Sequence, residues 1–180
     1  NEIIRGDASY YFSKYPHIWG WATWKRTWNT FDRDIKFWPQ WKNSYDFKKK
    51  FPTYLERKFW KKIFNQSFFG KVDSWGYPLF ASILRQGGLA ATPNFNLISN
   101  IGFGEDSTHT KEPNEKLSNL KLNSIGKLIH PQKVKINLEA DNYDFKNNFI
   151  DKNSLFPKNL LFFPKRLKGF LLRKFYKLKN

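Results

Sequence analysis

The chain has 180 residues, of which 40% are hydrophobic and 19% aromatic, and its formal net charge at pH 7 is +17. This length suits about one domain with a real hydrophobic core, and the apolar content excludes a disordered polyelectrolyte. The absence of cysteine excludes disulfides and thiolate metal sites, and no apolar run approaches the ~20 residues that a membrane-spanning helix requires.

The first residues of the sequence show no targeting segment. Residues 1–7 do not form a signal peptide, and they lack an initiator Met in a sequence that contains no Met at all. We therefore expect a fragment that begins within a longer protein.

Aromatic residues dominate the first 32 positions. We expect a strand over residues 9–12, with its aromatic side chains buried. Gly20 marks the change to a helix predicted over about residues 20–32. Steps of three and four residues place four rings on one face of this helix: Trp21, Trp24, Trp28 and Phe31. An aromatic stripe at this spacing usually packs inward, so we assign the helical rings to the core.

Trp19 and Trp21 have a second interpretation, because they flank a glycine at the boundary between two elements. Either ring is placed to form a wall of a cleft. Flat, rigid and amphipathic indoles suit stacking against a sugar or a base. The sequence leaves the core and the cleft open for these two residues.

The middle of the chain is predicted to be helical. Residues 37–41 form an irregular aromatic turn in this prediction, because Pro39 has no N–H and pushes Trp38 towards extended geometry. Helices follow over about residues 44–50 and 53–66. We interpret the lysines of the second helix as a solvated face.

A further helix is predicted to end near Arg85, and both Asp73 and Ser74 are residue types that cap helix N-termini. Two short strands are predicted after it, over residues 89–93 and 96–99. This order of strands and helices suits the trailing half of an α/β domain.

A polar loop, residues 100–110, follows the second short strand. It combines glycines at alternate positions with two carboxylates and a histidine, namely Gly102, Gly104, Glu105, Asp106 and His109. Sites in open α/β sheets gather at the carboxyl ends of strands, so this loop is a candidate site. A histidine beside hydroxyl groups in a loop is, by itself, more often a surface residue than a metal ligand.

The remainder of the chain divides into two segments. Residues 111–156 are a connecting segment with little periodicity, apart from a candidate strand at 134–138. Residues 157–180 form a tail with eight Lys or Arg and no acidic residue. Apolar residues repeat at helical spacing in this tail, so it suits the interface of an anionic membrane. The alternative is that its apolar face docks onto the domain. No recognition-module pattern accompanies the charge, so we expect no specific nucleic-acid partner.

Two motifs carry a resemblance to a known family. Residues 9–24, and then residues 99–104 with Thr108-His109-Thr110, resemble bacterial sugar transferases that are similar to family 2 glycosyltransferases. The resemblance covers about residues 8–110. It implies that residues 1–110 are the acceptor-side half of a glycosyltransferase A fold, an α/β domain. Such enzymes bind a nucleotide-diphosphate sugar and usually a divalent metal, and the acceptor is a hydroxyl on a glycan or a lipid-linked glycan in polysaccharide biosynthesis.

The resemblance also implies roles for particular residues. Asp73 is the candidate catalytic base, since an inverting transferase needs a carboxylate within reach of the attacking hydroxyl, and Glu105 and Asp106 are the fallback candidates. Capping of the helix explains Asp73 equally well. His109 is the candidate ligand of a Mn²⁺ or Mg²⁺ ion that neutralises the leaving diphosphate. The candidate substrate-binding residues are an aromatic platform with its glycines: Trp19, Gly20, Trp21, Trp24, Gly102 and Gly104.

Two features depart from the pattern of this family. Its nucleotide-binding half, with an acidic metal motif, precedes these motifs, and no such element precedes residue 1 here. We therefore expect this fragment to lack most of the donor site. Relatives are expected to read Trp-Asp-Tyr at the helix start, whereas this chain reads Trp75-Gly76-Tyr77. Asp73 is the nearest substitute for the aspartate that is absent at position 76.

These expectations place a transferase on the cytoplasmic face of the membrane, with residues 157–180 as its membrane address. Two alternatives belong to other classes. One is a membrane-surface binding protein that acts through the basic tail. The other is a non-specific nucleic-acid binder driven by phosphate neutralisation and aromatic stacking.

Overall fold

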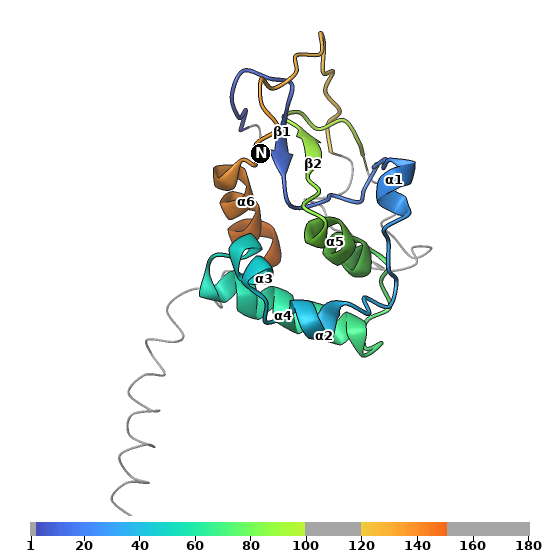
Figure 1. The fold of residues 1–180 in the computed structure, drawn as a ribbon. Helices are drawn as coiled ribbons and strands as arrows, with labels where there is room; N and C mark the ends of the chain where they lie inside the picture. Colours follow the sequence, from blue (N-terminus) through green and yellow to red (C-terminus); the bar gives the residue numbers. More distant parts are fainter. Residues whose placement is uncertain (1–2, 100–119, 151–180) are drawn as a thin grey trace, which may run out of the picture. The chain divides into compact units, whose positions relative to one another are not determined.

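The computed structural model describes residues 3–99 and 120–150 of the chain (Figure 1). The chain divides into two compact units, residues 1–138 and 139–180, and this boundary falls inside the predicted connecting segment 111–156. The first unit contains, in chain order, β1 (Tyr10–Ser13), α1 (Lys25–Trp28), α2 (Trp38–Trp41), α3 (Tyr45–Lys50), α4 (Tyr54–Phe68), α5 (Gly76–Arg85) and β2 (Ala90–Pro93). The described part of the second unit is α6 (Leu138–Asp144), which begins at the boundary, and the π-helical turn η1 (Phe145–Phe149).

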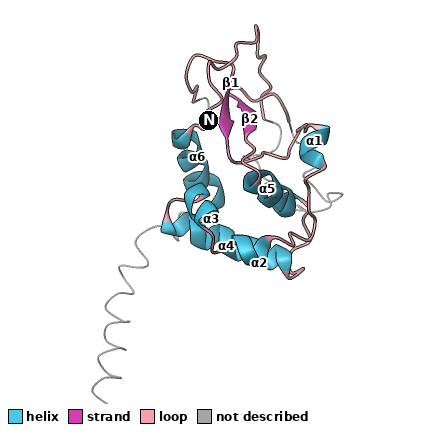
Figure 2. Cartoon of the chain, viewed as in Figure 1, coloured by secondary structure: helices cyan, strands magenta, loops and turns pink. Residues whose placement is uncertain are grey.

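The described residues are therefore mixed, with helices and one small sheet (Figure 2). Strands β1 and β2 are antiparallel, with Tyr10 opposite Pro93 and Ser13 opposite Ala90. Pro93 has no N–H to donate to the ladder, and its place at the end of the strand makes this loss tolerable. The strands predicted over residues 9–12 and 89–93 are confirmed, but Tyr10, Tyr11 and Phe12 are half-buried, so the prediction that the aromatic side chains of the first strand are buried is wrong.

The other two predicted strands are not formed. Residues 96–99 are irregular, so the prediction of a strand there is wrong. In the segment 134–138 only Ile136 makes a bridge, a parallel one to Phe12, and the Asn137 N–H donates to the Phe12 carbonyl at 2.7 Å. The sheet therefore has two strands among the described residues and a single bridge at its edge.

Helices α3 and α4 confirm the two helices predicted in the middle of the chain. Each begins at a side-chain cap: the Ser44 Oγ accepts from the Phe47 N–H at 3.1 Å, and the Thr53 Oγ1 accepts from the Glu56 N–H at 3.2 Å. These caps satisfy backbone donors that have no partner inside a helix. Helices α4 and α5 pack on each other, as do α2 and α4, and α3 and α5.

The core of the first unit is aromatic. Its fully buried rings come from α2, α3 and α4, from Phe51 between α3 and α4, and from Tyr15 after β1. Their centroids lie about 5 to 6 Å apart in edge-on, tilted and stacked pairs. Such arrangements match the electrostatic preference of aromatic rings. The largest buried aromatic side chains are Tyr15, Trp38, Phe47, Phe51, Trp60 and Phe64.

The helix predicted over residues 20–32 is wrong in extent and in orientation. Only α1 is helical, Gly20 has a φ of +58°, and Trp24 is extended with φ −78° and ψ 143°. Trp24 is 67% exposed and Trp28 is 46% exposed, so their assignment to the core is also wrong. The core is already filled by rings from later in the chain.

The aromatic turn expected at residues 37–41 is instead the short helix α2. Pro39 lies in its first turn, where a missing N–H costs nothing, and Trp38 is helical rather than extended. The prediction for Trp38 is therefore wrong. The helix lets Trp38 reach the core, and its indole N–H donates to the Asn65 Oδ1 at 2.9 Å.

Helix α5 confirms the helix predicted to end near Arg85, but its beginning differs from the prediction. The N-cap is Trp75, which already has helical dihedral angles of φ −78° and ψ −22° and makes no side-chain cap. The prediction that Asp73 or Ser74 caps this helix is therefore wrong. At the other end, Gly87 has a φ of +77°, which suits the stop predicted there.

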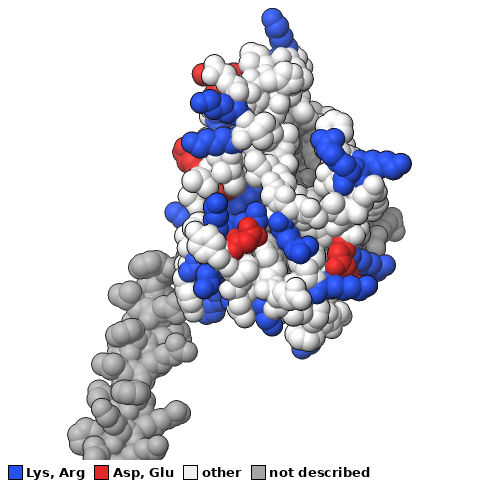
Figure 3. All heavy atoms as spheres, in the orientation of Figure 1, with Lys and Arg blue, Asp and Glu red and all other residues white. Residues whose placement is uncertain are grey.

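Basic side chains outnumber acidic ones on the surface of the described residues. On the face drawn in Figure 3, Lys and Arg lie over several separate regions, with few Asp and Glu between them. The tail, residues 157–180, lies outside the described residues.

Candidate functional site

Three segments that are far apart in the sequence meet beside the start of α5. A Cβ atom built on Gly20 would lie 2.5 Å from the Ile98 Cγ2, and one built on Gly76 would lie 2.9 Å from the Ile18 Cδ1. The two glycines therefore allow close approach of neighbouring segments. We call these four residues, Ile18, Gly20, Gly76 and Ile98, the glycine junction.

A stack of aromatic rings adjoins the glycine junction. Trp21 stacks on Trp75 with ring centroids 5.4 Å apart and an angle of 30° between the planes. Trp28 continues the stack at 6.2 Å from Trp21, and Phe31 lies 5.1 Å from Trp28. Trp75 is 44% exposed, so this tryptophan stack (Trp75, Trp21, Trp28 and Phe31) lies at the surface.

Two more tryptophans beside the stack are exposed. Trp19 is 44% exposed and directly precedes Gly20. Trp24 carries the Arg26 guanidinium over its ring, with the guanidinium carbon 4.9 Å from the ring centroid. Exposed indoles offer flat apolar faces with one polar edge, which suits stacking against a sugar ring. Neither of the two cavities described below is lined by Trp19, Trp21 or Trp24, so the cleft interpretation of Trp19 and Trp21 stays a prediction.

Asp73 lies in the loop between α4 and α5, two residues before Trp75 of the stack. The loop turns tightly, since the Ser74 N–H donates to the Val72 carbonyl at 3.2 Å. Asp73 is exposed and does not cap α5. The Asp73 carboxylate therefore does not have the helix-capping role that was the alternative to catalysis.

The surroundings of Gly76 explain why glycine occupies the position at which the family resemblance predicts an aspartate. The Ile18 side chain occupies the space next to Gly76, so any Cβ there displaces the end of Ile18. The backbone of Gly76 is helical, and a larger residue meets a flexible methyl group rather than backbone. Asp73 thus lies three residues before Gly76, which belongs to the glycine junction.

The remaining predicted site residues lie outside the described residues: Gly102, Gly104, Glu105, Asp106 and His109. The chain enters that segment from Ile98 and Ser99, and Ile98 belongs to the glycine junction. The Asn96 carbonyl accepts from the Asn123 N–H at 2.9 Å, and its side-chain amide donates to the Lys121 carbonyl at 3.0 Å. Both flanks of the undescribed segment are therefore held close together.

Neither a metal cluster nor a membrane span is found in residues 3–99 and 120–150. Within these ranges no group of three His, Asp or Glu side chains could hold a metal ion. The helices of the same ranges are all too short or too polar to cross a membrane.

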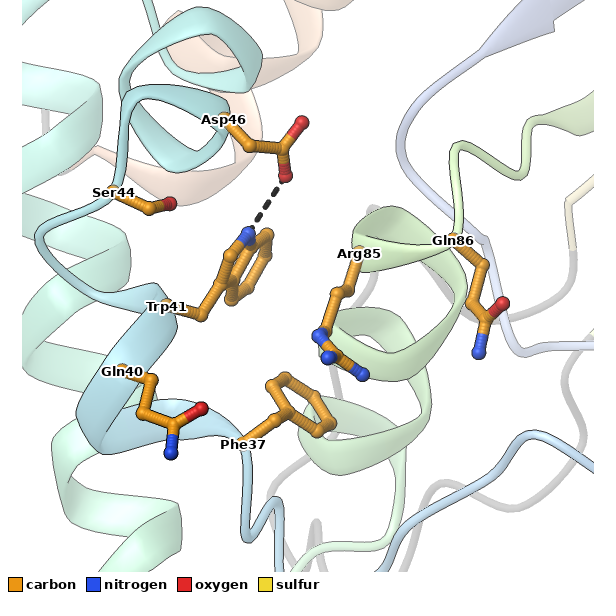
Figure 4. Close-up of a pocket in the computed structure, with 7 residues that line it drawn as sticks. All are labelled: Phe37, Gln40, Trp41, Ser44, Asp46, Arg85 and Gln86. Carbon is orange, nitrogen blue, oxygen red and sulfur yellow. Dashed lines mark hydrogen bonds between the residues drawn. The ribbon is translucent and has the colours of Figure 1, made fainter.

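Sequence reasoning missed a cavity of about 490 Å³ between α2, α3 and the end of α5 (Figure 4). On its α2–α3 side the Trp41 indole N–H donates to the Asp46 Oδ2 at 2.7 Å, and the Arg85 guanidinium carbon lies 4.7 Å from the Phe37 ring centroid (Figure 4). The lining residues are Phe37, Gln40, Trp41, Ser44, Asp46, Arg85 and Gln86. No sequence motif predicts this cavity, because only the packing of the three helices brings its lining residues together.

A second cavity, of about 400 Å³, lies along β1. It is lined by residues 5–8, 10–12 and 129–132 and by Lys135 and Asn137. It shares no residue with the glycine junction or with the first cavity. The sequence contained one weak signal for it, namely histidine and lysine close to the candidate strand at 134–138.

Comparisons of the chain with protein-family models, with curated proteins and with solved structures found no match.

Proposed function

We propose that this chain is the acceptor-side part of a glycosyltransferase that moves a sugar from a nucleotide-diphosphate sugar to a hydroxyl of a glycan or lipid-linked acceptor. The glycine junction is the observation that carries this proposal. It brings together the aromatic motif around Gly20, the helix start that follows Asp73, and Ile98, which precedes the segment 100–110 in the sequence. To the first two of these stretches the sequence assigned substrate binding and the base, and the candidate metal ligand follows the third in the sequence.

Asp73 has the chemistry that the transfer step needs. As the acceptor hydroxyl attacks the sugar, its proton must leave, and an ionised carboxylate within hydrogen-bond distance accepts it. Asp73 is exposed beside the tryptophan stack and does no capping work. Glu105 and Asp106, outside the described residues, are the alternative bases in this proposal.

The exposed tryptophans supply binding rather than chemistry. A sugar ring presents C–H groups on one face, which pack on an indole, while the indole N–H is a donor for a hydroxyl. Trp19 and Trp24 present such surfaces next to Gly20, and Trp21 is positioned by its stack on Trp75. In this proposal they hold the acceptor near Asp73.

A divalent metal, Mn²⁺ or Mg²⁺, belongs to the proposal through His109 alone. The described residues hold no metal-binding group of their own, and His109 lies outside them. When bound, such an ion neutralises the negative charge that develops on the leaving diphosphate. The residues described here act only on the acceptor side of the reaction.

The test is an assay of donor hydrolysis and sugar transfer by the complete gene product, with Mn²⁺ or Mg²⁺ and a panel of nucleotide-sugars. Replacing Asp73 by Asn removes the basic oxygen at constant size, and we expect kcat to fall by about 10² to 10⁴-fold. Asp34→Asn is the matched control, because Asp34 is an exposed aspartate remote in sequence from the glycine junction. Turnover that survives Asp73→Asn moves the base to Glu105 or Asp106, and His109→Ala tests the metal ligand.

A second candidate function rests on the charge of the tail. Eight Lys or Arg without an acidic residue in 157–180 favour binding to an anionic membrane surface, at the cytoplasmic face in this proposal. Binding to anionic vesicles should then disappear when residues 157–180 are removed and should survive Asp73→Asn and His109→Ala. Absence of turnover with every donor, together with tight vesicle binding, would leave this as the function.

A further inference from the structure

The cavity along β1 is built from three segments that are fixed to the strand by buried polar groups. Ser9, which is 6% exposed, exchanges hydrogen bonds with residue 129: its N–H donates to the Ile129 carbonyl at 2.9 Å, and its Oγ accepts from the Ile129 N–H at 2.9 Å. These bonds fix the segment that contains His130. We call this cavity the β1-edge pocket.

Asn94, which is 7% exposed, fixes the opposite wall of the β1-edge pocket. Its Oδ1 accepts from the Arg5 N–H at 3.0 Å, and its Nδ2 donates to the carbonyls of Arg5 at 3.2 Å and Ala8 at 2.8 Å. Buried amides with several backbone partners hold a loop in one conformation. The third wall, with Lys135, is held by the bridge between Phe12 and Ile136. The pocket is therefore preformed, as small-ligand sites usually are.

The lining of this pocket contains two basic side chains and several neutral hydrogen-bond donors among its apolar residues. Arg5 and Lys135 are the basic residues in the lining, and Asp7 is its one acidic residue. The Arg5 guanidinium lies over the Tyr11 ring, 5.0 Å from its centroid, which orients its planar fork. An excess of positive charge at a concave, fixed surface favours an anionic ligand.

A tyrosine and a histidine form a polar pair in the same pocket. The Tyr10 hydroxyl and the His130 Nδ1 are 3.1 Å apart, and the two rings meet edge to face with centroids 5.9 Å apart. When the neutral imidazole carries its proton on Nε2, the tyrosine donates to Nδ1 and the Nε2–H is a donor for a ligand. In the other tautomer the Nδ1–H donates to the tyrosine hydroxyl and Nε2 is an acceptor, so the first tautomer is the one that offers a donor to a ligand.

We propose that the β1-edge pocket binds a phosphate group, with Arg5, His130 and Lys135 as the donors. Guanidinium and ammonium groups are the usual partners of phosphate oxygens, because charge-assisted hydrogen bonds are shorter and stronger than neutral ones. The pocket shares no residue with the glycine junction, so this proposal is independent of the proposed glycosyl transfer. The phosphate comes either from a phosphorylated sugar or nucleotide, or from free phosphate or pyrophosphate.

The test is calorimetric titration of the complete chain with inorganic pyrophosphate at fixed salt, followed by glucose 1-phosphate, uridine monophosphate and inorganic phosphate. Lys135→Gln is compared with Lys133→Gln, since both lysines are exposed and two residues apart, and only Lys135 lines the pocket. We expect Lys135→Gln and Arg5→Gln each to weaken pyrophosphate binding about 10-fold, the equivalent of one charge-assisted hydrogen bond. Lys133→Gln should change it less than about twofold on the same scale.

The NMR resonances of His130 provide a second measurement, because non-specific attraction of pyrophosphate to basic residues would not shift them. Pyrophosphate should shift the imidazole NMR resonances of His130, and Tyr10→Phe, which keeps the ring, should reduce the affinity. Each variant is first shown to melt at the wild-type temperature. Equal loss in Lys133→Gln and Lys135→Gln, an unmoved His130 resonance, or no binding at all would overturn the proposal. The strongest binder among the four ligands identifies the source of the phosphate.

Discussion

Gly20 combines two constraints at one residue, a left-handed backbone and a crowded neighbour. Its φ is +58°, and a Cβ there would lie 2.5 Å from the Ile98 Cγ2 and 3.3 Å from the Ile98 Cβ. A non-glycine residue with this backbone costs about 1–2 kcal/mol before any contact is counted. At Gly20 the neighbour is the segment that leads into residues 100–110, so the cost is felt at the proposed site.

We predict that Gly20→Ala lowers the free energy of unfolding by about 2–4 kcal/mol, as the sum of backbone strain and the collision with Ile98. Gly70→Ala is the matched control, because Gly70 has a φ of +64° and nothing within 4 Å of a built Cβ. It should cost only the backbone term, about 1–2 kcal/mol. Urea denaturation measures both, and equal losses would show that Ile98 yields without cost.

A buried charge pair lies at the other side of the first unit. The Lys14 Nζ lies 2.5 Å from the Glu56 Oε1, and the two side chains are 5% and 4% exposed. The Tyr15 hydroxyl donates to the same oxygen at 2.5 Å, and the Lys14 Nζ also donates to the Lys50 carbonyl at 3.2 Å. Both charges are thus compensated inside the protein.

We predict that Glu56→Ala lowers the free energy of unfolding by about 3–5 kcal/mol, because it removes the buried carboxylate that the Lys14 ammonium and the Tyr15 hydroxyl both contact. The exposed pair of Lys36 and Asp34, 3.8 Å apart, provides the comparison. Asp34→Ala should cost less than about 0.5 kcal/mol, since water replaces the partner. Similar losses for both variants in chemical denaturation would contradict the buried pair.

Residues at the N-termini of helices differ in their roles: some cap the helix, and others are candidates for a catalytic role. Thr53 caps α4 with its side chain, whereas Asp73 stands before α5 without capping it. We predict that Thr53→Ala lowers the free energy of unfolding by about 1 kcal/mol. Asp73→Ala should change it by less than about 0.5 kcal/mol, as for an ordinary surface position. A loss of 1 kcal/mol or more in Asp73→Ala thermal melts, on that scale, would restore its capping role.

At the scale of the whole molecule, the tryptophans divide into a buried and an exposed set. Trp38 is fully buried and hydrogen-bonded to Asn65, whereas Trp24 is 67% exposed. We predict that Trp38→Ala costs about 3–5 kcal/mol, enough to unfold a marginally stable domain. Trp24→Ala should cost less than about 1 kcal/mol, mainly through the lost contact with Arg26.

The same pair of variants bears on function. If the exposed tryptophans form the acceptor platform, Trp24→Ala raises the KM for the acceptor while the melting temperature stays at the wild-type value. Loss of folding in Trp24→Ala, seen by circular dichroism, would return this ring to the core. Unchanged acceptor kinetics with an intact fold would remove Trp24 from the platform.

Local signals in the sequence were sufficient for most of the regular elements. The runs at 9–12 and 89–93 form β1 and β2, and the helices that begin after Ser44 and Thr53 form because side chains at those positions satisfy the first backbone N–H groups. Helix α5 ends where glycine permits a positive φ. Each of these features depends on residues within a few positions of one another.

The orientation of the aromatic rings was decided by the tertiary structure. Helical spacing shows which residues share a face, but not whether that face meets the core, and rings from α2 and α4 already fill the core that Trp24 and Trp28 were assigned to. The conformation of Gly20 likewise depends on Ile98, far away in the sequence.

Both cavities and the glycine junction have the same origin. Arg5, Tyr10, His130 and Lys135 line one pocket because buried Ser9 and Asn94, together with the bridge between Phe12 and Ile136, fix distant segments beside β1. The sequence by itself determined the composition, the local elements and a set of candidate residues. The tertiary structure decided which of the described candidates meet, because long-range packing and buried hydrogen bonds set distances that sequence spacing does not contain.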